Sequence, residues 1–234
     1  MLDFFKQVIN SFIDVLFPEY CISCGRPLRR DEDYLCLDCW LDMPLSYIKQ
    51  SKDNFVVRKF WGRLPVEAGF SYIIFTKHSG VQSILHAIKY DKASDLAVQL
   101  GKIIGVYLRD KTDFPEFDIL LPVPLHWKKL RIRGYNQAEE IAKGIAEILP
   151  AKIVTTAVER TVFNPTQTKK NREERWQNVQ NIFSVKKHRA LDGKHIVLVD
   201  DVLTTGATLE SLASEILKST HGVKISVITL AVAK

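Results

Sequence analysis

The sequence predicts an α/β fold, in which a doubly wound, mostly parallel sheet follows a small N-terminal metal-binding module. Apolar, β-branched runs such as His195–Val199 have the pattern of strands buried on both faces, and they alternate with amphipathic helical patterns. All four cysteines lie near the N-terminus, as two C-x-x-C pairs. A chain of 234 residues is long enough for one core domain and a small extra module. We expect these to be residues 1–55 and 56–234.

The composition indicates a globular protein that contacts anions. Hydrophobic residues make up 46% of the chain, and the net charge is +6. Lys and Arg gather at 128–133 and 169–175, and such patches suit phosphates, pyrophosphate or nucleic acid. No run approaches the ~18 to 20 apolar residues of a membrane span. Residues 1–17 have the pattern of an amphipathic helix without a signal-peptide pattern, so we expect this helix to dock on its own domain, with a membrane or partner surface as the alternative, and the protein to be cytoplasmic.

The cysteine spacing predicts a structural zinc site. Each C-x-x-C pair can place two thiolates on one side of a tight turn, and two such turns complete a tetrahedral sulfur site. A closed four-thiolate shell leaves no position for substrate, so the zinc should be structural. Two disulfides and an iron–sulfur cluster are the alternatives, and the lack of an export signal and the paired spacing favour zinc over them. The four ligands would be Cys21, Cys24, Cys36 and Cys39.

The middle of the chain predicts two helices, a strand, a basic loop and a third helix. The helical pattern from Val81 to Leu108 is interrupted near residues 90–92, and Ile119–Pro124 has the pattern of a buried strand stopped by prolines. A basic loop over Leu125–Gly134 and a helix over Ala138–Leu149 should follow. Strand, basic loop and helix in this order suit a pyrophosphate, whose oxygens need several donors on one side.

The last third of the chain predicts three further strands and a lid. The strands are expected at Lys152–Ala157, Ile182–Val185 and Ile225–Val232. A long polar segment, Arg160–Asn178, lies between the first two, and segments of this kind are lids or surface loops. A lid would exclude water from a reacting sugar and bring cations to a leaving anion. Its candidate cations are Lys169, Lys170, Arg172 and Arg175.

Val197–Leu209 joins a strand, two adjacent carboxylates and a turn of small residues that opens a helix. The amides of such a turn and the positive end of the helix dipole bind an anion. Asp200 and Asp201 can accept hydrogen bonds from sugar hydroxyls, so a ribose 5-phosphate fits both halves. The alternative is an ordinary strand-to-helix turn without a ligand, but adjacent carboxylates gain nothing as a cap.

This segment resembles the motif for 5-phosphoribosyl-1-pyrophosphate (PRPP) in type I phosphoribosyltransferases. The resemblance implies that Asp200 and Asp201 hold the ribose hydroxyls and that Mg²⁺ bridges the pyrophosphate and the sugar. Members that act on 6-oxopurines carry an Asp where this chain has Thr204, so salvage of such bases is disfavoured. The 5-phosphate would lie against Thr204, Thr205, Gly206, Ala207 and Thr208. The candidate pyrophosphate contacts are Arg133, Asn136 and Gln137, with Arg133 joining the two aspartates as a catalytic candidate.

The whole chain is similar to the ComF family. The segments that carry this resemblance are Phe17-Pro18 before the cysteines, Ile88-Lys89-Tyr90, Pro122 to His126, Arg133 to Ala138, Gln167, Arg175, Asn178, Phe183 and the Asp200-Asp201 motif. That family is associated with natural competence, the uptake of single-stranded DNA. The resemblance therefore implies PRPP, single-stranded DNA and a competence helicase or translocation machinery as partners, and type I enzymes imply a homodimer by analogy.

Two functions remain open on the sequence. The first is an enzyme that transfers 5-phosphoribosyl from PRPP to an unidentified nitrogen acceptor. The second is a non-catalytic protein that senses PRPP or a nucleotide and binds single-stranded DNA. Trp127 and Trp176 lie in the two basic clusters and could stack on bases, although packing in the core or at a hinge is favoured for each. A scaffold with a vestigial pocket is disfavoured because the acidic and glycine positions are intact.

Overall fold

A parallel five-stranded sheet organises the molecule. The computed structural model describes residues 18–77, 79–91, 93–162 and 182–233. The strand order is β1-β7-β6-β2-β3, and all four strand pairs are parallel. The predicted parallel sheet is confirmed. The strands are β1 (Gly69–Phe75), β2 (Ile119–Pro122), β3 (Lys152–Ile153), β6 (His195–Leu203) and β7 (Lys224–Ala233).

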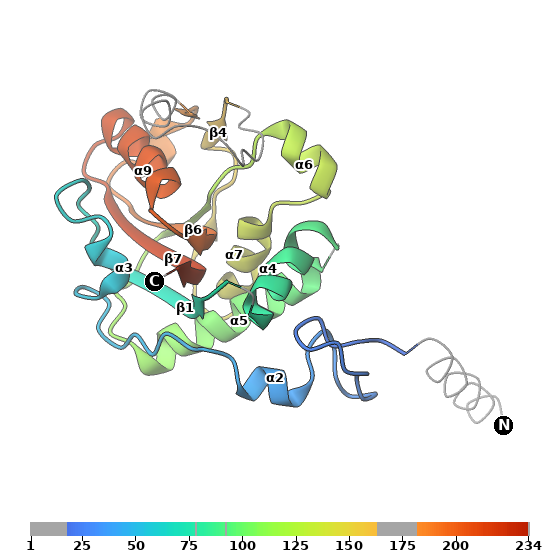
Figure 1. Cartoon of the computed structure of the whole chain (residues 1–234). Helices are drawn as coiled ribbons and strands as arrows, with labels where there is room; N and C mark the ends of the chain where they lie inside the picture. The colour runs from blue at the N-terminus through green and yellow to red at the C-terminus, as the bar shows by residue number, and fades with distance from the viewer. Residues whose placement is uncertain (1–17, 78, 92, 163–181, 234) are drawn as a thin grey trace.

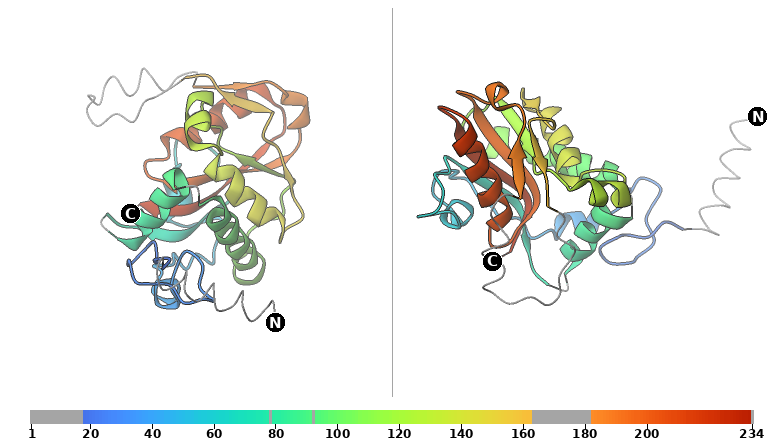
Figure 2. Two further views of the ribbon diagram at one scale, coloured as in Figure 1. Left: turned by 90° about the vertical axis from the view of Figure 1, so that its right-hand side faces the viewer. Right: turned by 90° about the horizontal axis from the view of Figure 1, so that it is seen from above.

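Helices cover both faces of this sheet, as a doubly wound fold requires (Figures 1 and 2). On one side α5 and α7 pack together, while α9 lies on the other. The longer helices are α4 (Gly80–Tyr90), α5 (Ser94–Lys111), α7 (Gln137–Ala146) and α9 (Ala207–Ser219). The short ones are α2 (Leu37–Leu41), α3 (Phe55–Arg58), α6 (Trp127–Arg133) and the 3₁₀ turn η1 (His188–Ala190).

A second, two-stranded sheet stands beside the main one. In it β4 (Val158–Arg160) pairs antiparallel with β5 (Phe183–Val185). The predicted strand at Lys152–Ala157 is thus wrong in length, because β3 keeps only two residues of it and the chain turns towards β4. The lid candidates Lys169, Lys170, Arg172 and Arg175, Trp176, and the N-terminal helix of residues 1–17 lie outside the described residues.

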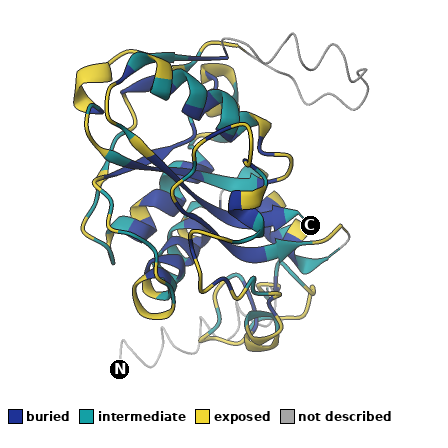
Figure 3. Cartoon of the chain, turned by 90° about the vertical axis from the view of Figure 1, so that its left-hand side faces the viewer, coloured by how far each residue is buried: buried dark blue, intermediate teal, exposed yellow. Residues whose placement is uncertain are grey.

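The sheet forms the core, and β6 and β7 are buried along most of their length (Figure 3). On one face α5 and α7 cross backbone to backbone at small residues. A Cβ on Gly101 would lie 2.2 Å from the carbonyl oxygen of Ile141, and a Cβ on Gly144 would lie 2.1 Å from that of Val98. Only glycine permits this approach. The close crossing fixes α7, whose first residues line the pocket described below.

The N-terminal module is joined to the sheet by its own backbone. After α2, the amide of Ser46 donates to the carbonyl of Tyr72 at 2.9 Å, and the amide of Ile74 donates to the carbonyl of Pro44 at 2.8 Å. This segment therefore covers the outer edge of β1, which would otherwise expose unpaired groups. The division of the chain at residue 55 stays a prediction, since residues before it already contact the sheet.

Candidate functional site

The Asp pair lies where the fold opens a crevice. From β2 the chain crosses through α7 to β3, whereas from β6 it crosses through α9 to β7 on the opposite face. The gap between β2 and β6 is therefore a topological switch point, and ligands of open α/β sheets bind at the carboxyl end of such a point. Ladder pairing of β2 with β6 ends at Pro122, opposite Val199, just before Asp200.

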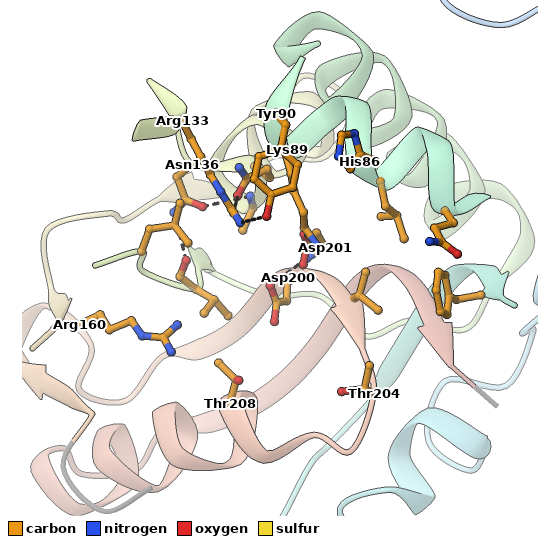
Figure 4. Close-up of a pocket in the computed structure, with 18 of the residues that line it drawn as sticks. His86, Lys89, Tyr90, Arg133, Asn136, Arg160, Asp200, Asp201, Thr204 and Thr208 are labelled. Atoms are coloured by element: carbon orange, nitrogen blue, oxygen red, sulfur yellow. Dashed lines mark hydrogen bonds and ion pairs between the residues drawn. The ribbon is translucent and has the colours of Figure 1, made fainter. Parts of the chain in front are cut away.

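Asp200 and Asp201 lie within β6 rather than after it. The strand was predicted to end at Val199, but it continues to Leu203 because β7 stays paired with it, Val202 opposite Ala231 and Leu203 opposite Val232. The carboxylates are consequently held on a rigid strand whose other neighbour, β2, has already ended. They face a cavity of about 650 Å³ (Figure 4).

The cavity draws its walls from several separate parts of the chain. In Figure 4, Arg133, Asn136 and Arg160 lie on one side of the Asp pair, His86, Lys89 and Tyr90 of α4 lie above it, and Thr204 and Thr208 lie below. Every labelled side chain in that view borders the cavity. The apolar lining comes from Phe75, Leu85, Val123, Leu125, Ala138 and Val202. Such a mixture of an apolar wall and converging polar groups is typical of small-molecule sites.

A lysine that the sequence did not single out for this site neutralises half of the Asp pair. The ammonium of Lys89 lies 2.6 Å from Oδ2 of Asp201, and both side chains are largely shielded from solvent. Asp200 instead accepts the backbone amide of Asp201 at 2.9 Å. Burial, followed by the like charge of Asp201, raises the pKa of Asp200 to about 8. Asp201 thus has a cation as its partner, whereas burial favours the protonated form of Asp200.

The turn after β6 has the geometry of an anion cradle. Gly206 adopts φ of +84° and caps α9, which begins at Ala207. The residues of the predicted 5-phosphate loop surround a small hollow of about 40 Å³ next to Asp200. The amide of Ala207 donates to Oγ1 of Thr205 at 3.4 Å, and the other amides of the first helical turn and the dipole of a 13-residue helix point to this end. The structure thus brings Thr204, Thr205, Gly206, Ala207 and Thr208 together.

A segment after α3 supports this turn from behind. A Cβ on Gly206 would lie 2.9 Å from Cε1 of Phe60, a fully buried ring. Arg63 pairs with Glu210 of α9 and donates to the carbonyl of Thr205 at 3.4 Å. The turn is therefore packed and hydrogen-bonded from a part of the chain far from it in sequence.

The predicted basic loop Leu125–Gly134 is wrong over most of its length, because Trp127–Arg133 form the helix α6. The ring of His126 accepts the amide of Lys128 at 3.2 Å and so caps the start of the helix, and Gly134 ends it at φ of +84°. The helix has no buried residue, and Trp127 is 60% exposed. The preferred interpretation of Trp127 as a packing residue is therefore wrong.

Arg133 lies in the pocket wall, held by two neighbours. Its Nη1 donates to Oε1 of Gln137 at 2.9 Å, its Nη2 donates to the hydroxyl of Tyr90 at 3.4 Å, and its guanidinium stacks 5.2 Å from the Tyr90 ring centroid. Gln137 is 2% exposed, and its Nε2 has no partner among the described residues. An unpaired buried donor beside a cation favours an oxygen-rich ligand at this wall.

Asn136 has a structural task that its sequence pattern did not suggest. Its Oδ1 accepts the amide of Ala138 at 3.2 Å, which caps α7, and its Nδ2 donates to the carbonyl of Val123 at 3.0 Å. The side chain therefore ties the start of α7 to the segment after β2. The structure brings the three predicted pyrophosphate residues together, and the hydrogen bonds of the Asn136 side chain go to the backbone that it fixes.

Of two further cations near the Arg133 wall, Arg160 lines the cavity and Lys129 lies close enough to Arg160 to be affected by its charge. Arg160, in β4, borders the pocket, and burial lowers its pKa; burial and then the positive charge of Arg160 also lower the pKa of Lys129. Cations crowded together in this way gain from an anion placed between them. Sequence reasoning missed Arg160 because its position depends on the β4–β5 hairpin, which no local pattern indicates.

The four cysteines form one cluster. All four sulfurs lie within 4.8 Å of one another, and the Sγ atoms of Cys24 and Cys36 are 3.7 Å apart. Thiolates around a tetrahedral zinc ion, each ~2.3 Å from the metal, stand roughly 3.8 Å apart, so this donor set fits zinc. Gly25, at φ of +73°, donates its amide to the carbonyl of Cys21 at 2.8 Å and closes the first turn. The cluster is Cys21, Cys24, Cys36 and Cys39.

The first cysteine turn also contacts the helix that carries Lys89. A Cβ on Gly80, the first residue of α4, would lie 1.9 Å from Oγ of Ser23. Burial raises the pKa of Cys39 to about 12, whereas the neighbouring Arg26 guanidinium lowers the pKa of Cys24 to about 6. Because Ser23 contacts Gly80 of α4, the metal module packs directly on the helix that forms one wall of the pocket.

Comparison with known proteins places the chain in a family. A model of the phosphoribosyl transferase domain matches residues 135–234, and one of the double zinc ribbon domain matches residues 12–50. "Competence protein ComFC" of Bacillus subtilis is 32% identical over 218 residues, which cover 90% of this chain and 76% of that protein. The chain belongs to the ComF family. It carries the family's phosphoribosyltransferase domain and four-cysteine module.

Other relatives bear names that refer to DNA. "DNA utilization protein YhgH" of Escherichia coli K12 is 27% identical over 208 residues, covering 85% of this chain and 84% of that protein. "Competence protein F" of Haemophilus influenzae is 25% identical over 203 residues, covering 82% and 88%. A solved structure titled as the allosteric regulatory enzyme of purine biosynthesis aligns at a TM-score of 0.40 and 16% identity; the match spans 61% of this chain and 30% of that one. In the described part of the chain, no helix is both long and apolar enough to cross a membrane.

Proposed function

We propose that this protein binds PRPP in the cavity beside Asp200 and Asp201 and transfers its 5-phosphoribosyl group to a nitrogen acceptor. The observation that carries the proposal is the arrangement of anion-binding elements on both sides of the Asp pair. The turn of residues 204–208 lies on one side and the Arg133 wall on the other. PRPP carries a phosphate at C5 of its ribose and a pyrophosphate at C1, with two ribose hydroxyls between them. The phosphate would face the turn and the pyrophosphate would face the Arg133 wall.

Each part of the site would act on one part of this ligand. The ribose hydroxyls would donate to the two carboxylates, and the amides at the start of α9 would hold the 5-phosphate. In the transfer, the nitrogen lone pair forms a bond to C1 while the bond from C1 to the pyrophosphate oxygen breaks. The pyrophosphate leaves with that electron pair, and the nitrogen releases its proton to water. Arg133, Lys129 and Arg160 would stabilise the charge that develops on the leaving group.

Magnesium is the cofactor that the type I resemblance implies, and the chemistry of the Asp pair fits it. Carboxylate oxygens are the hard ligands that Mg²⁺ prefers, and Asp200 would exchange its proton for a cation. In the described residues, only the four cysteines form a group of three or more metal-binding side chains. The pair would therefore share the ion with ligand oxygens. When bound, Mg²⁺ would neutralise the pyrophosphate and hold it against the sugar.

Titration calorimetry of the zinc-loaded protein with PRPP tests the proposal. We expect binding in the wild type and its loss in Asp201→Asn, which keeps the shape of the side chain but removes the charge. Asp110→Asn is the control, because Asp110 pairs with Arg109 on the surface of α5. Pyrophosphate release is then measured over nitrogenous bases and ammonia. The proposal fails if PRPP does not bind, if Asp201→Asn binds as tightly as the wild type, or if no acceptor gives release.

A second candidate function is a non-catalytic role in DNA uptake, favoured by the surface of α6. Trp127 is exposed, and the ammonium of Lys128 lies 5.5 Å from its ring centroid, which is the combination that stacks single-stranded bases. Relatives are named for competence and DNA utilisation. In this role the pocket would sense PRPP or a nucleotide while α6 holds DNA for a competence helicase or translocation machinery, and a homodimer would extend the surface.

Fluorescence titration with oligo-dT separates the two candidates. The DNA-handling role predicts affinity that falls with salt and with Trp127→Ala. Trp61→Ala is the matched control, since Trp61 is 59% exposed and carries Arg58 at 5.3 Å from its ring centroid. PRPP binding without pyrophosphate release, together with this DNA signature, would favour the second candidate. Equal effects of the two Trp substitutions would remove the assignment to α6.

A further inference from the structure

Lys89 reaches the Asp pair from a helix that is fixed at both ends. At its start, Gly80 lies against Ser23 of the first cysteine turn. At its end, the hydroxyl of Tyr135 donates to the carbonyl of Ile88. Placement of the Lys89 ammonium 2.6 Å from Asp201 is therefore a property of the packed fold.

The contact places a positive charge where a sugar ligand has to bind. In the described part of the chain, no other Lys, Arg or His forms an ion pair with either aspartate. Both members of the contact are mostly shielded, with 25% of the Lys89 side chain and 15% of the Asp201 side chain exposed. A partly buried pair of this kind interacts more strongly than a surface pair, because solvent screens it less.

A polyanionic ligand makes this charge useful. PRPP carries a phosphate and a pyrophosphate, and two adjacent carboxylates repel such a ligand unless a cation lies among them. The wall next to Lys89 continues through Tyr90 to Arg133, which already faces the cavity. The four-carbon stem of a lysine lets its ammonium move between neighbouring acceptors. An ammonium released from Asp201 by a sugar hydroxyl would find phosphate oxygens within the same cavity.

We propose that Lys89 is the built-in counter-cation of the Asp200–Asp201 pair. It neutralises Asp201 in the free protein, and it turns to the pyrophosphate oxygens when the ribose hydroxyls take its place. Lys89 supplies part of the charge that would otherwise come from a divalent ion, so PRPP binding depends only weakly on Mg²⁺. This role rests on the proposed function, because it takes PRPP as the ligand.

Calorimetric titration with PRPP, in buffer freed of Mg²⁺ by a resin and in buffer with Mg²⁺, tests the role. A soluble chelator is avoided because it would also remove the structural zinc. The proteins are the full-length wild type, Lys89→Met, which keeps the length of the stem, and Lys89→Arg, which keeps the charge. Lys102→Met is the control, since Lys102 forms a comparable 2.7 Å pair with Glu147 at the surface, between α5 and the end of α7.

We expect the omission of Mg²⁺ to weaken binding at least about tenfold more in Lys89→Met than in the wild type, a coupling of roughly 1.4 kcal/mol. Lys89→Arg should behave like the wild type, and Lys102→Met should match it in both buffers. Equal Mg²⁺ dependence in wild type and Lys89→Met overturns the role of Lys89 and leaves the proposed function standing. Tighter binding by Lys89→Met in both buffers also overturns it, because Lys89 would then be a competitor of the ligand. If the wild type does not bind PRPP in either buffer, both proposals fail.

Discussion

Replacement of Gly206 by alanine tests how the anion-binding turn is built. Gly206 has φ of +84°, where a residue with a Cβ costs roughly 1–2 kcal/mol. The new Cβ would also lie 2.9 Å from Cε1 of the buried Phe60 ring. Overpacking of this kind costs about 1–3 kcal/mol. We therefore expect Gly206→Ala to lower the free energy of unfolding by about 2–5 kcal/mol.

Gly222→Ala is the control that separates the two causes. Gly222 also has a positive φ, of +66°, but the nearest atom to a Cβ there is 3.7 Å away. It should lose only the backbone part, about 1–2 kcal/mol. Adding Phe60→Leu to Gly206→Ala should be less costly than the sum of the two single changes, since the smaller side chain relieves the contact.

Equilibrium urea denaturation measures these differences, and calorimetry with PRPP measures their effect on the site. If the ring of Phe60 holds the turn in place, Gly206→Ala weakens PRPP binding as well as stability, whereas Gly222→Ala changes stability alone. Equal destabilisation by the two substitutions, with no coupling to Phe60, would refute the reasoning about the contact.

Three other predictions concern protons, zinc and the Arg133 wall. The folded protein holds the proton of Asp200 up to about pH 8, while an unfolded Asp releases it near pH 4; this contribution to stability is therefore complete in acid and is lost as the pH rises from about 4 to about 8. The urea midpoint of Asp200→Asn should therefore rise relative to that of the wild type as the pH increases through that range. If the midpoints of the two proteins change with pH in parallel, the assignment of this proton to Asp200 is contradicted. Removal of zinc should unfold the cysteine module and, through the contact of Ser23 with Gly80, weaken PRPP binding. Circular dichroism measures the unfolding and calorimetry measures the loss of PRPP binding, each before and after zinc is restored. Unaltered spectra in protein verified to be free of metal would contradict this prediction. Gln137→Leu should weaken PRPP binding about fivefold or more, because it removes the Nε2 donor that has no protein partner in the described residues and also the Oε1 acceptor that holds Arg133 in the pocket wall; unchanged affinity would show that no ligand oxygen reaches this side chain.

The sequence alone predicts those sites whose functional residues lie close together in one short segment. The Asp pair, the small-residue turn and the two C-x-x-C pairs are local patterns, and the structure brings the members of each together. The parallel sheet was also predictable, because its central strands β6 and β7 contain continuous apolar runs. Local patterns specify local geometry, and these sites need little else.

The other parts of the site and of the fold depend on contacts between segments that are distant in the sequence, or on the residues that cap a short helix. Lys89 and Arg160 reach the pocket only through the order of the sheet and the β4–β5 hairpin, which no local pattern encodes. The strand β1 was not anticipated, although Gly69–Phe75 is an apolar run. The segment that forms the helix α6 is rich in charges, which is typical of loops, and the signals for a helix there are only its two ends, His126 and Gly134.

The most direct test of the proposed site is a calorimetric titration of the zinc-loaded wild-type protein with PRPP, followed by a pyrophosphate-release assay over nitrogen acceptors. We expect one saturable PRPP site per chain that Asp201→Asn abolishes, and release of pyrophosphate with one class of acceptor. Absence of PRPP binding by the folded, zinc-loaded wild type would contradict the central claim that the Asp pair, the turn and the Arg133 wall form a site for this ligand.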